Sequence, residues 1–165
     1  MKSIWLIRHA KSSWKDISLR DFERPLNSRG KRDAPFMGQK LYEVGFMPDM
    51  VISSPAKRAK LTAIEICKAI NFSIDDIIFE QFIYGAEVSN LLHLINNLRD
   101  KTNTVCIFGH NPTLTDFCNY LSGSNIYNIP TCGIAEISFD TDHWSNISKE
   151  LGELKRFDYP KKYLT

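Results

Sequence analysis

The 165-residue sequence has no long hydrophobic run, no CxxC pair and little net charge. Without an apolar stretch of about 20 residues there is no candidate transmembrane helix, so no membrane partner is expected. A net charge of +2 gives no reason to expect a nucleic-acid partner. The cysteines stand apart in the sequence, which argues against a zinc knuckle or a redox motif and indicates reduced, mostly buried thiols at Cys67, Cys106, Cys118 and Cys132.

Repeats, low-complexity tracts and linkers are also absent from the sequence. The length suits one domain, 1–165, and the hydrophobic fraction of 43% with 24% charged residues is typical of a globular protein. Met1-Lys2-Ser3 leads into a run that is too short and too mixed for a signal peptide. A cytoplasmic protein is therefore expected.

Three short apolar runs each end abruptly in polar residues. Residues 4–7 lead into Arg8-His9, residues 50–52 into Ser53-Ser54-Pro55, and residues 105–108 into Gly109-His110. Continuous, partly β-branched runs of this length are typical of strands buried on both faces of a parallel sheet. Further strands are predicted at residues 77–79, 133–139 and 153–157.

Segments of helical period lie between these runs. Each carries an apolar stripe that predicts a face packed on the core: Ala34, Met37, Leu41 and Val44; Ala59, Ala63, Ile66, Cys67 and Ile70; Val88, Leu91, Leu92 and Ile95; Leu114, Phe117, Cys118 and Leu121. Alternating strands and helices predict an α/β fold, a three-layer sandwich with a mostly parallel central sheet flanked by helices.

Two helix starts are marked by a capping residue followed by proline. Ser54-Pro55 and Asn111-Pro112 each offer an N-cap and a proline for the first helical position. Pro35 leaves two interpretations open. It either begins a helix or lies within one that begins near Ser28 and kinks it.

The carboxyl ends of parallel strands meet at one edge of a sheet, where ligands bind in open α/β folds. That edge would collect Arg8 and His9, then Arg58 in the first turn of the next helix, then His110. Helix N-termini and arginine forks both favour phosphate oxygens. The sequence therefore predicts a site for a dianion.

Three motifs occur in order along the chain: Leu6-Ile7-Arg8-His9-Ala10, the stretch from Ser53 to Ala63, and Gly109-His110-Asn111-Pro112. They resemble the Arg-His-Gly signature and the second and third motifs of the histidine phosphatase superfamily, the phosphoglycerate-mutase-like enzymes. The segment from Arg24 to Gly30 resembles the one that opens the first helix of that superfamily. The short chain and the sequence Arg-His-Ala-Lys-Ser-Ser-Trp are similar to the small SixA-like phosphohistidine phosphatases. Ala10 replaces a common glycine, which matters only if that residue needs a positive φ.

The resemblance implies that His9 is the nucleophile and carries the phosphoryl group as a covalent intermediate. It also implies that Arg8, Arg58 and His110 bind the phosphoryl oxygens and stabilise charge during transfer. A neutral imidazole can attack at pH 7 without a separate base. A loose phosphoryl transition state is stabilised mainly by positioning of the reacting groups and by positive charge, which arginines supply. Neither a metal nor another cofactor is therefore expected.

Other residues near this edge remain open to two interpretations. Arg24 either reaches the phosphoryl group or pairs at the surface with Asp21 or Glu23. Lys11, Ser12 and Ser13 either line the mouth of the site or form an ordinary polar loop. Glu80 and Glu87 are candidate proton donors, although solvated surface glutamates are common. His93 and His143 are expected to lie outside the site.

Without a dedicated acid, cleavage of a phosphorus–nitrogen bond is favoured, because imidazole leaves more easily than an alkoxide. The predicted function is a phosphatase acting on a phosphorylated substrate, with protein phosphohistidine the leading candidate. A small-molecule phosphomonoesterase is the alternative, followed by a catalytically silent phosphate-binding module. Metal ligation by His9 and His110 lacks a partner at ligand spacing, and a mutase lacks material for a lid. A monomer is expected.

Overall fold

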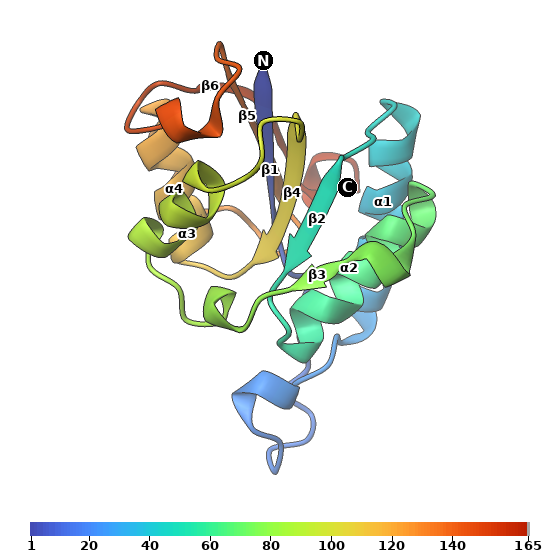
Figure 1. Ribbon diagram of the computed structural model, residues 1–165. Helices are drawn as coiled ribbons and strands as arrows, with labels where there is room; N and C mark the ends of the chain where they lie inside the picture. Colours follow the sequence, from blue (N-terminus) through green and yellow to red (C-terminus); the bar gives the residue numbers. More distant parts are fainter. Residues whose placement is uncertain (165) are drawn as a thin grey trace.

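The computed structural model describes residues 1–164 and contains a six-stranded sheet in the order β3-β2-β4-β1-β5-β6 (Figure 1). Four strands run parallel: β1 (Lys2–Arg8), β2 (Met50–Ser53), β3 (Ile78–Phe79) and β4 (Thr104–Gly109). Two antiparallel strands follow β1 at one edge: β5 (Ile134–Phe139) and β6 (Glu153–Asp158). The predicted α/β fold with a mostly parallel sheet is confirmed, and all six predicted strands form.

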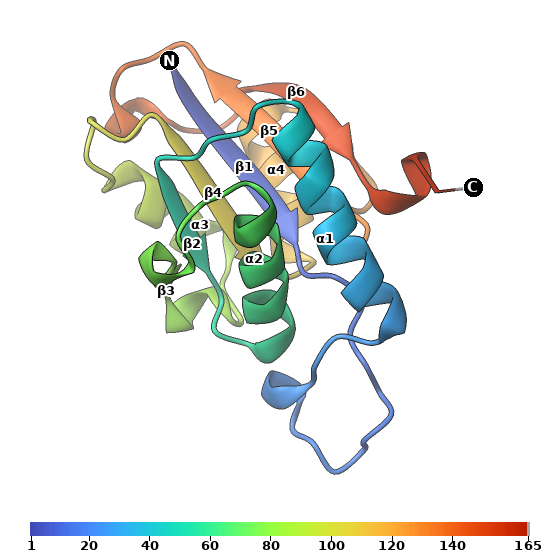
Figure 2. The ribbon, with the colours of Figure 1, turned by 90° about the vertical axis from the view of Figure 1, so that its right-hand side faces the viewer.

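Helices cover both faces of the sheet (Figure 2). One face carries α1 (Ser28–Glu43) and α2 (Lys57–Ala69), and the other carries α3 (Val88–Asn96) and α4 (Thr113–Ser122). Short 3-10 helices occur at η1 (Asp21–Glu23), η2 (Ile74–Asp76), η3 (Gln81–Ile83), η4 (Trp144–Asn146) and η5 (Pro160–Lys162). Across residues 1–164, no helix is both long enough and apolar enough to cross a bilayer.

The central strand β1 divides the core into two clusters. Ile4 and Leu6 pack with residues of α3 and α4, whereas Trp5 and Ile7 pack with residues of α1 and α2. Successive side chains of a strand point to opposite faces, so a continuous apolar run fills both layers. The predicted helix stripes lie on these core faces, except that Val44 follows the end of α1 and is 50% exposed.

The two helices marked by proline begin later than the sequence suggests. α2 begins at Lys57 instead of Pro55, because Ala56 is still extended and its amide donates to the Ser54 hydroxyl at 3.2 Å. α4 begins at Thr113, with Pro112 at the capping position. The Asn111 side chain accepts hydrogen bonds from the amide and the hydroxyl of Thr115.

The start of α1 fixes the loop that follows β1. Asn27 caps the helix by accepting a hydrogen bond from the Gly30 amide at 2.9 Å, and Pro35 lies inside the helix and does not begin it. A Cβ on Gly30 would overlap the carbonyl oxygen of Lys11. Glycine is therefore required at this close approach, which holds the residues after His9 against the first turn of α1.

The chain between β1 and α1 projects beyond the carboxyl edge of the sheet before it returns through η1 (Figures 1 and 2). Trp14 on this excursion is 68% exposed, and its ring stacks on the Arg24 guanidinium at 3.3 Å. The return through η1 brings Asp21 against α2, where Arg58 binds it.

Candidate active site

The register between β1 and β4 brings the two histidines of the sequence motifs together. Arg8 lies opposite Gly109, so His9 and His110 follow at the same edge of the sheet. Their ring centroids are 5.2 Å apart, and the His9 amide donates to the Gly109 carbonyl at 3.1 Å. The predicted convergence of strand ends is therefore present in the structure.

The hydrogen bond of His9 identifies its reactive nitrogen. Nδ1 lies 2.8 Å from the carbonyl oxygen of Ala10, which can only accept, so Nδ1 carries the proton. Burial is the main cause that lowers the pKa of His9 to about 3; the charges of Arg58 and Arg8 act in the same direction, and the hydrogen bond to Ala10 opposes them. At neutral pH the ring is therefore uncharged, and Nε2 has a free lone pair.

His110 follows β4 and forms a hydrogen bond with a residue that follows the neighbouring strand β2. Its Nε2 lies 2.8 Å from the Ser54 hydroxyl, at the carboxyl end of β2. Burial, followed by the charge of Arg58, lowers the pKa of His110 to about 4. Within residues 1–164, Nδ1 of His110 is buried without a hydrogen-bond partner.

Two guanidinium groups supply the positive charge. Arg58 is buried and donates to the Asp21 carbonyl at 2.7 Å and to its carboxylate at 3.0 Å. Arg8 donates to the carbonyl of Ile129 at 3.0 Å. Burial and the charge of Arg58 both lower the pKa of Arg8. Two like charges in a desolvated setting form a region that favours an anion.

Asp21 is a residue that the sequence did not assign to this site. Its carboxylate binds Arg58, Arg24 and the Tyr84 hydroxyl at 2.8–3.0 Å. Partial burial opposes its ionisation, but the hydrogen bonds from Tyr84 and Arg58 outweigh burial and bring the pKa of Asp21 to about 2. Tyr84 in turn presents its ring edge to His110. Asp21 lies in a polar loop without a recognisable motif, so no sequence signal marked it.

Arg24 pairs with Asp21 at 2.8 Å, one of the two interpretations that the sequence left open for it. The Arg24 side chain is buried, whereas that of Asp21 is 48% exposed. Arg24 also donates to the Ser12 hydroxyl and, at 3.1 Å, to the Ser13 carbonyl. Ser12 and Ser13 therefore hold Arg24, while Ala10 has no positive φ and replaces glycine without backbone strain.

The two candidate proton donors lie on the segment between β3 and α3. Glu80 follows β3, is half-buried, and its amide donates to the Ser53 carbonyl at 3.0 Å. Glu87 is exposed at the start of α3. In the part of the chain that the structure describes, neither carboxylate bonds to His9 or His110. Their role as acids stays a prediction.

The remaining histidines lie elsewhere, as expected. His93 is exposed in the last turn of α3, and His143 pairs with Asp100 at 2.8 Å. Among the 164 described residues, no group of three or more histidine, cysteine, aspartate or glutamate side chains is arranged to hold a metal ion.

The fold and the site define a class: three-layer α/β proteins that gather imidazole and guanidinium groups at the carboxyl edge of a parallel sheet. Residues 4–81 match the family model of the histidine phosphatase superfamily, branch 1. An uncharacterized protein of Mycobacterium tuberculosis, Rv1276c, is 30% identical over 166 residues, which cover 94% of this chain and all of the relative. The chain belongs to the histidine phosphatase superfamily.

Solved structures extend the similarity to the whole fold. SixA from Agrobacterium tumefaciens has a TM-score of 0.82 and 26% identity, covering 96% of this chain and 98% of that protein. The protein histidine phosphatase SixA complexed with tungstate has a TM-score of 0.79 and 19% identity, covering 97% and 98%. Family membership and the 26% identical neighbour support phosphatase activity, and the tungstate complex shows the same fold.

The imidazole of His9 is expected to stay neutral well below pH 6.5, because burial and nearby positive charge lower its pKa to about 3. NMR of protein labelled in the histidine rings, with a His9→Gln variant for assignment, would follow the ring between pH 4.5 and 8. A midpoint near 6.5 for His9 would contradict this. The free energy of unfolding should also decrease as the pH falls from 6.5, since the unfolded chain then binds a proton that folded His9 excludes.

Asp21→Asn is expected to tighten the binding of inorganic phosphate roughly threefold to tenfold, because a charge removed at about 5 Å in a partly exposed site changes the energy by about 1 kcal/mol. Asparagine still accepts a hydrogen bond from Arg58, so the guanidinium keeps its position. Titration calorimetry would measure the dissociation constant. Asp16→Asn is the matched control, since Asp16 is exposed on the same excursion and bonds only Ser18 among the described side chains. Unchanged or weaker binding by Asp21→Asn would refute the expectation.

Proposed function

We propose that this protein hydrolyses a phosphoryl group, above all from protein phosphohistidine, through a covalent intermediate on His9. The observation that carries the proposal is the state of His9. Its ring is neutral, its proton is held on Nδ1 by the Ala10 carbonyl, and positive groups surround it. A free Nε2 beside two guanidinium groups suits attack on a phosphoryl dianion.

In the first step of the proposed reaction, Nε2 of His9 attacks phosphorus. A phosphorus–nitrogen bond to His9 forms while the bond to the leaving group breaks. Arg8 and Arg58 neutralise the phosphoryl oxygens, and His110, whose ring lies beside that of His9, binds one of them. Preorganised charges of this kind stabilise the transition state without needing to reorient during the reaction.

The leaving group decides which substrate suits the site. A phosphohistidine ring whose second nitrogen is protonated leaves as neutral imidazole, so it needs no acid from the enzyme. An alkoxide needs one, because of its very high pKa. Glu80 and Glu87 make no contact with His9 or His110 among the described residues, which favours the imidazole leaving group. SixA from Agrobacterium tumefaciens, which is 26% identical and is described as a phosphohistidine phosphatase, supports the same choice.

In the second step, water attacks the phosphoryl group on His9. The phosphorus–oxygen bond forms, the bond to Nε2 breaks, and hydrogen phosphate leaves. Both protons of the water leave with the phosphate, which releases one of them to solvent to become hydrogen phosphate at neutral pH. His9 returns to the neutral state in which it began, so the cycle consumes only water and phosphorylated substrate. The low pKa of His9 favours departure of phosphate, because the ring has little tendency to hold a positive charge.

A small-molecule phosphomonoesterase is the second candidate. Glu80 favours it, since this half-buried carboxylate follows β3 directly at the edge that carries Ser53 and Ser54.

A substrate panel separates the two candidates. Matched peptides bearing phosphohistidine or phosphoserine, together with a sugar phosphate, would be assayed without added metal and with chelator. We expect kcat/KM for the phosphohistidine peptide to exceed the others by at least roughly 100-fold, as the difference in leaving-group pKa requires. Faster turnover of the sugar phosphate, abolished in Glu80→Gln, would favour the phosphomonoesterase instead.

Acid-labile, base-stable phosphate is expected on the protein when turnover of a labelled substrate is quenched rapidly. His9→Ala should trap none and lose activity, while His93→Ala serves as the control because that ring is exposed in α3. Unchanged thermal unfolding would show that the variant folds. Label on a serine, or normal turnover by His9→Ala, would rule out the intermediate.

A further inference from the structure

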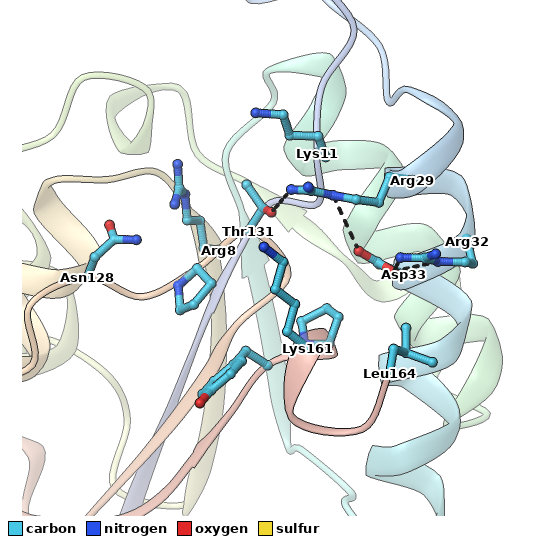
Figure 3. A pocket seen from close by; sticks show the side chains of 12 residues that line it. Arg8, Lys11, Arg29, Arg32, Asp33, Asn128, Thr131, Lys161 and Leu164 are labelled. Atoms are coloured by element: carbon cyan, nitrogen blue, oxygen red, sulfur yellow. Dashed lines mark hydrogen bonds and ion pairs between the residues drawn. The ribbon is translucent and has the colours of Figure 1, made fainter.

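A cavity of about 570 Å³ adjoins the candidate active site on the side of Arg8 (Figure 3). Its walls come from four separate parts of the chain: the loop after β1, the first half of α1, residues 128–131 before β5, and the C-terminal turn at η5. The histidines do not line the cavity but Arg8 does, so the cavity adjoins the proposed site of phosphoryl transfer and shares Arg8 with it.

The lining of this cavity is strongly basic. Arg8, Lys11, Arg29, Arg32 and Lys161 contribute five cationic side chains, against one carboxylate. That carboxylate, Asp33, is buried and is already occupied by Arg32 at 2.9 Å and Arg29 at 4.0 Å. Within residues 1–164, Lys11 and Lys161 make no ion pair. The cavity therefore carries an excess of positive charge that Asp33 neutralises only in part.

Arg8 joins the cavity to the proposed reaction. It precedes His9 in the chain and also lines the cavity (Figure 3), where its Nε is buried without a partner in the described chain. A substrate whose phosphoryl group lies at His9 would thus place its neighbouring groups at the mouth of the cavity. The opposite wall, formed partly by Tyr159 and Pro160, is apolar and can cover the stem of a side chain.

The positive charge faces solvent over a broad mouth. The side chain of Arg29 is 43% exposed and that of Arg32 59%, and Lys161 is exposed as well. Long, exposed cationic side chains can meet carboxylates carried on a polypeptide segment at several positions, whereas a small dianion is better matched by an enclosed cluster.

We propose that this cavity is a specificity subsite for acidic side chains that flank the phosphohistidine of a protein substrate. That the substrate carries phosphohistidine rests on the proposed function. That acidic flanking residues are preferred rests on the basic lining of the cavity. Carboxylates enter the basic cavity while the phosphoryl group lies at His9, so recognition lowers KM for acidic substrates. The attraction is partly exposed and is therefore screened by salt.

The test compares two phosphohistidine peptides that differ only in having glutamate or glutamine at the flanking positions. At low ionic strength we expect KM to be roughly threefold to tenfold lower for the glutamate peptide, as a few partly exposed ion pairs would give. The double variant Lys11→Gln/Lys161→Gln should bring the two KM values together, as should 0.5 M salt. Lys149→Gln, an exposed lysine remote from the cavity lining, should keep the full preference.

Equal KM values for the two peptides in the wild-type protein would overturn the proposal, as would a preference that persists in the double variant. Stronger competition by inorganic pyrophosphate than by the glutamate peptide, lost in the double variant, would assign the cavity to small dianions and also overturn it. If neither phosphopeptide is hydrolysed, the proposed function fails by itself. Fluorescence anisotropy with the unphosphorylated peptides then tests the subsite by itself. Tighter binding of the glutamate peptide that is lost in the double variant supports the subsite, and equal binding of the two peptides by the wild-type protein refutes it.

Discussion

The parallel register between β1 and β4 is the constraint on which the site depends. Because Arg8 lies opposite Gly109, the next residue of each strand is a histidine, and the two rings lie side by side. A slip of one residue would turn every side chain of β1 to the opposite face, exchanging Ile4 and Leu6 with Trp5 and Ile7 between the two core layers. The packing of the core therefore determines the positions of the groups at the strand ends.

Those groups form a region in which positive charge is concentrated and water is scarce. Burial keeps the imidazoles of His9 and His110 neutral, and Arg58 adds to that effect on both. Asp21 is the carboxylate that balances Arg58, and it comes from an excursion of the chain beyond the sheet. The site thus combines neutral nucleophilic nitrogen with fixed cations, two properties that burial and charge repulsion maintain together.

Much of this arrangement is predictable from the sequence, and the failures have physical causes. Short apolar runs gave the strands, and the parallel strand ends predicted that Arg8, His9 and His110 meet. The predicted start of α2 at Pro55 was wrong, because the Ser54 hydroxyl accepts the Ala56 amide and also faces His110. The start of α4 was one residue early, since Pro112 is its capping residue. Asp21 and the basic cavity were not foreseen, since both arise from contacts between segments far apart in the chain. Local patterns carry no information about such contacts.

The cysteines have a consequence for oxidative chemistry. All four are buried, and burial raises the pKa of Cys67 to about 12 and that of Cys118 to about 11. Cys132 lies directly behind the site, where its amide donates to the carbonyl oxygens of Arg8 and His9, and burial raises the pKa of its thiol as well. Peroxide attacks thiolates, and these side chains remain protonated thiols at cellular pH. Oxidants that inactivate thiolate-dependent phosphatases therefore have no ready target in this protein's cysteines.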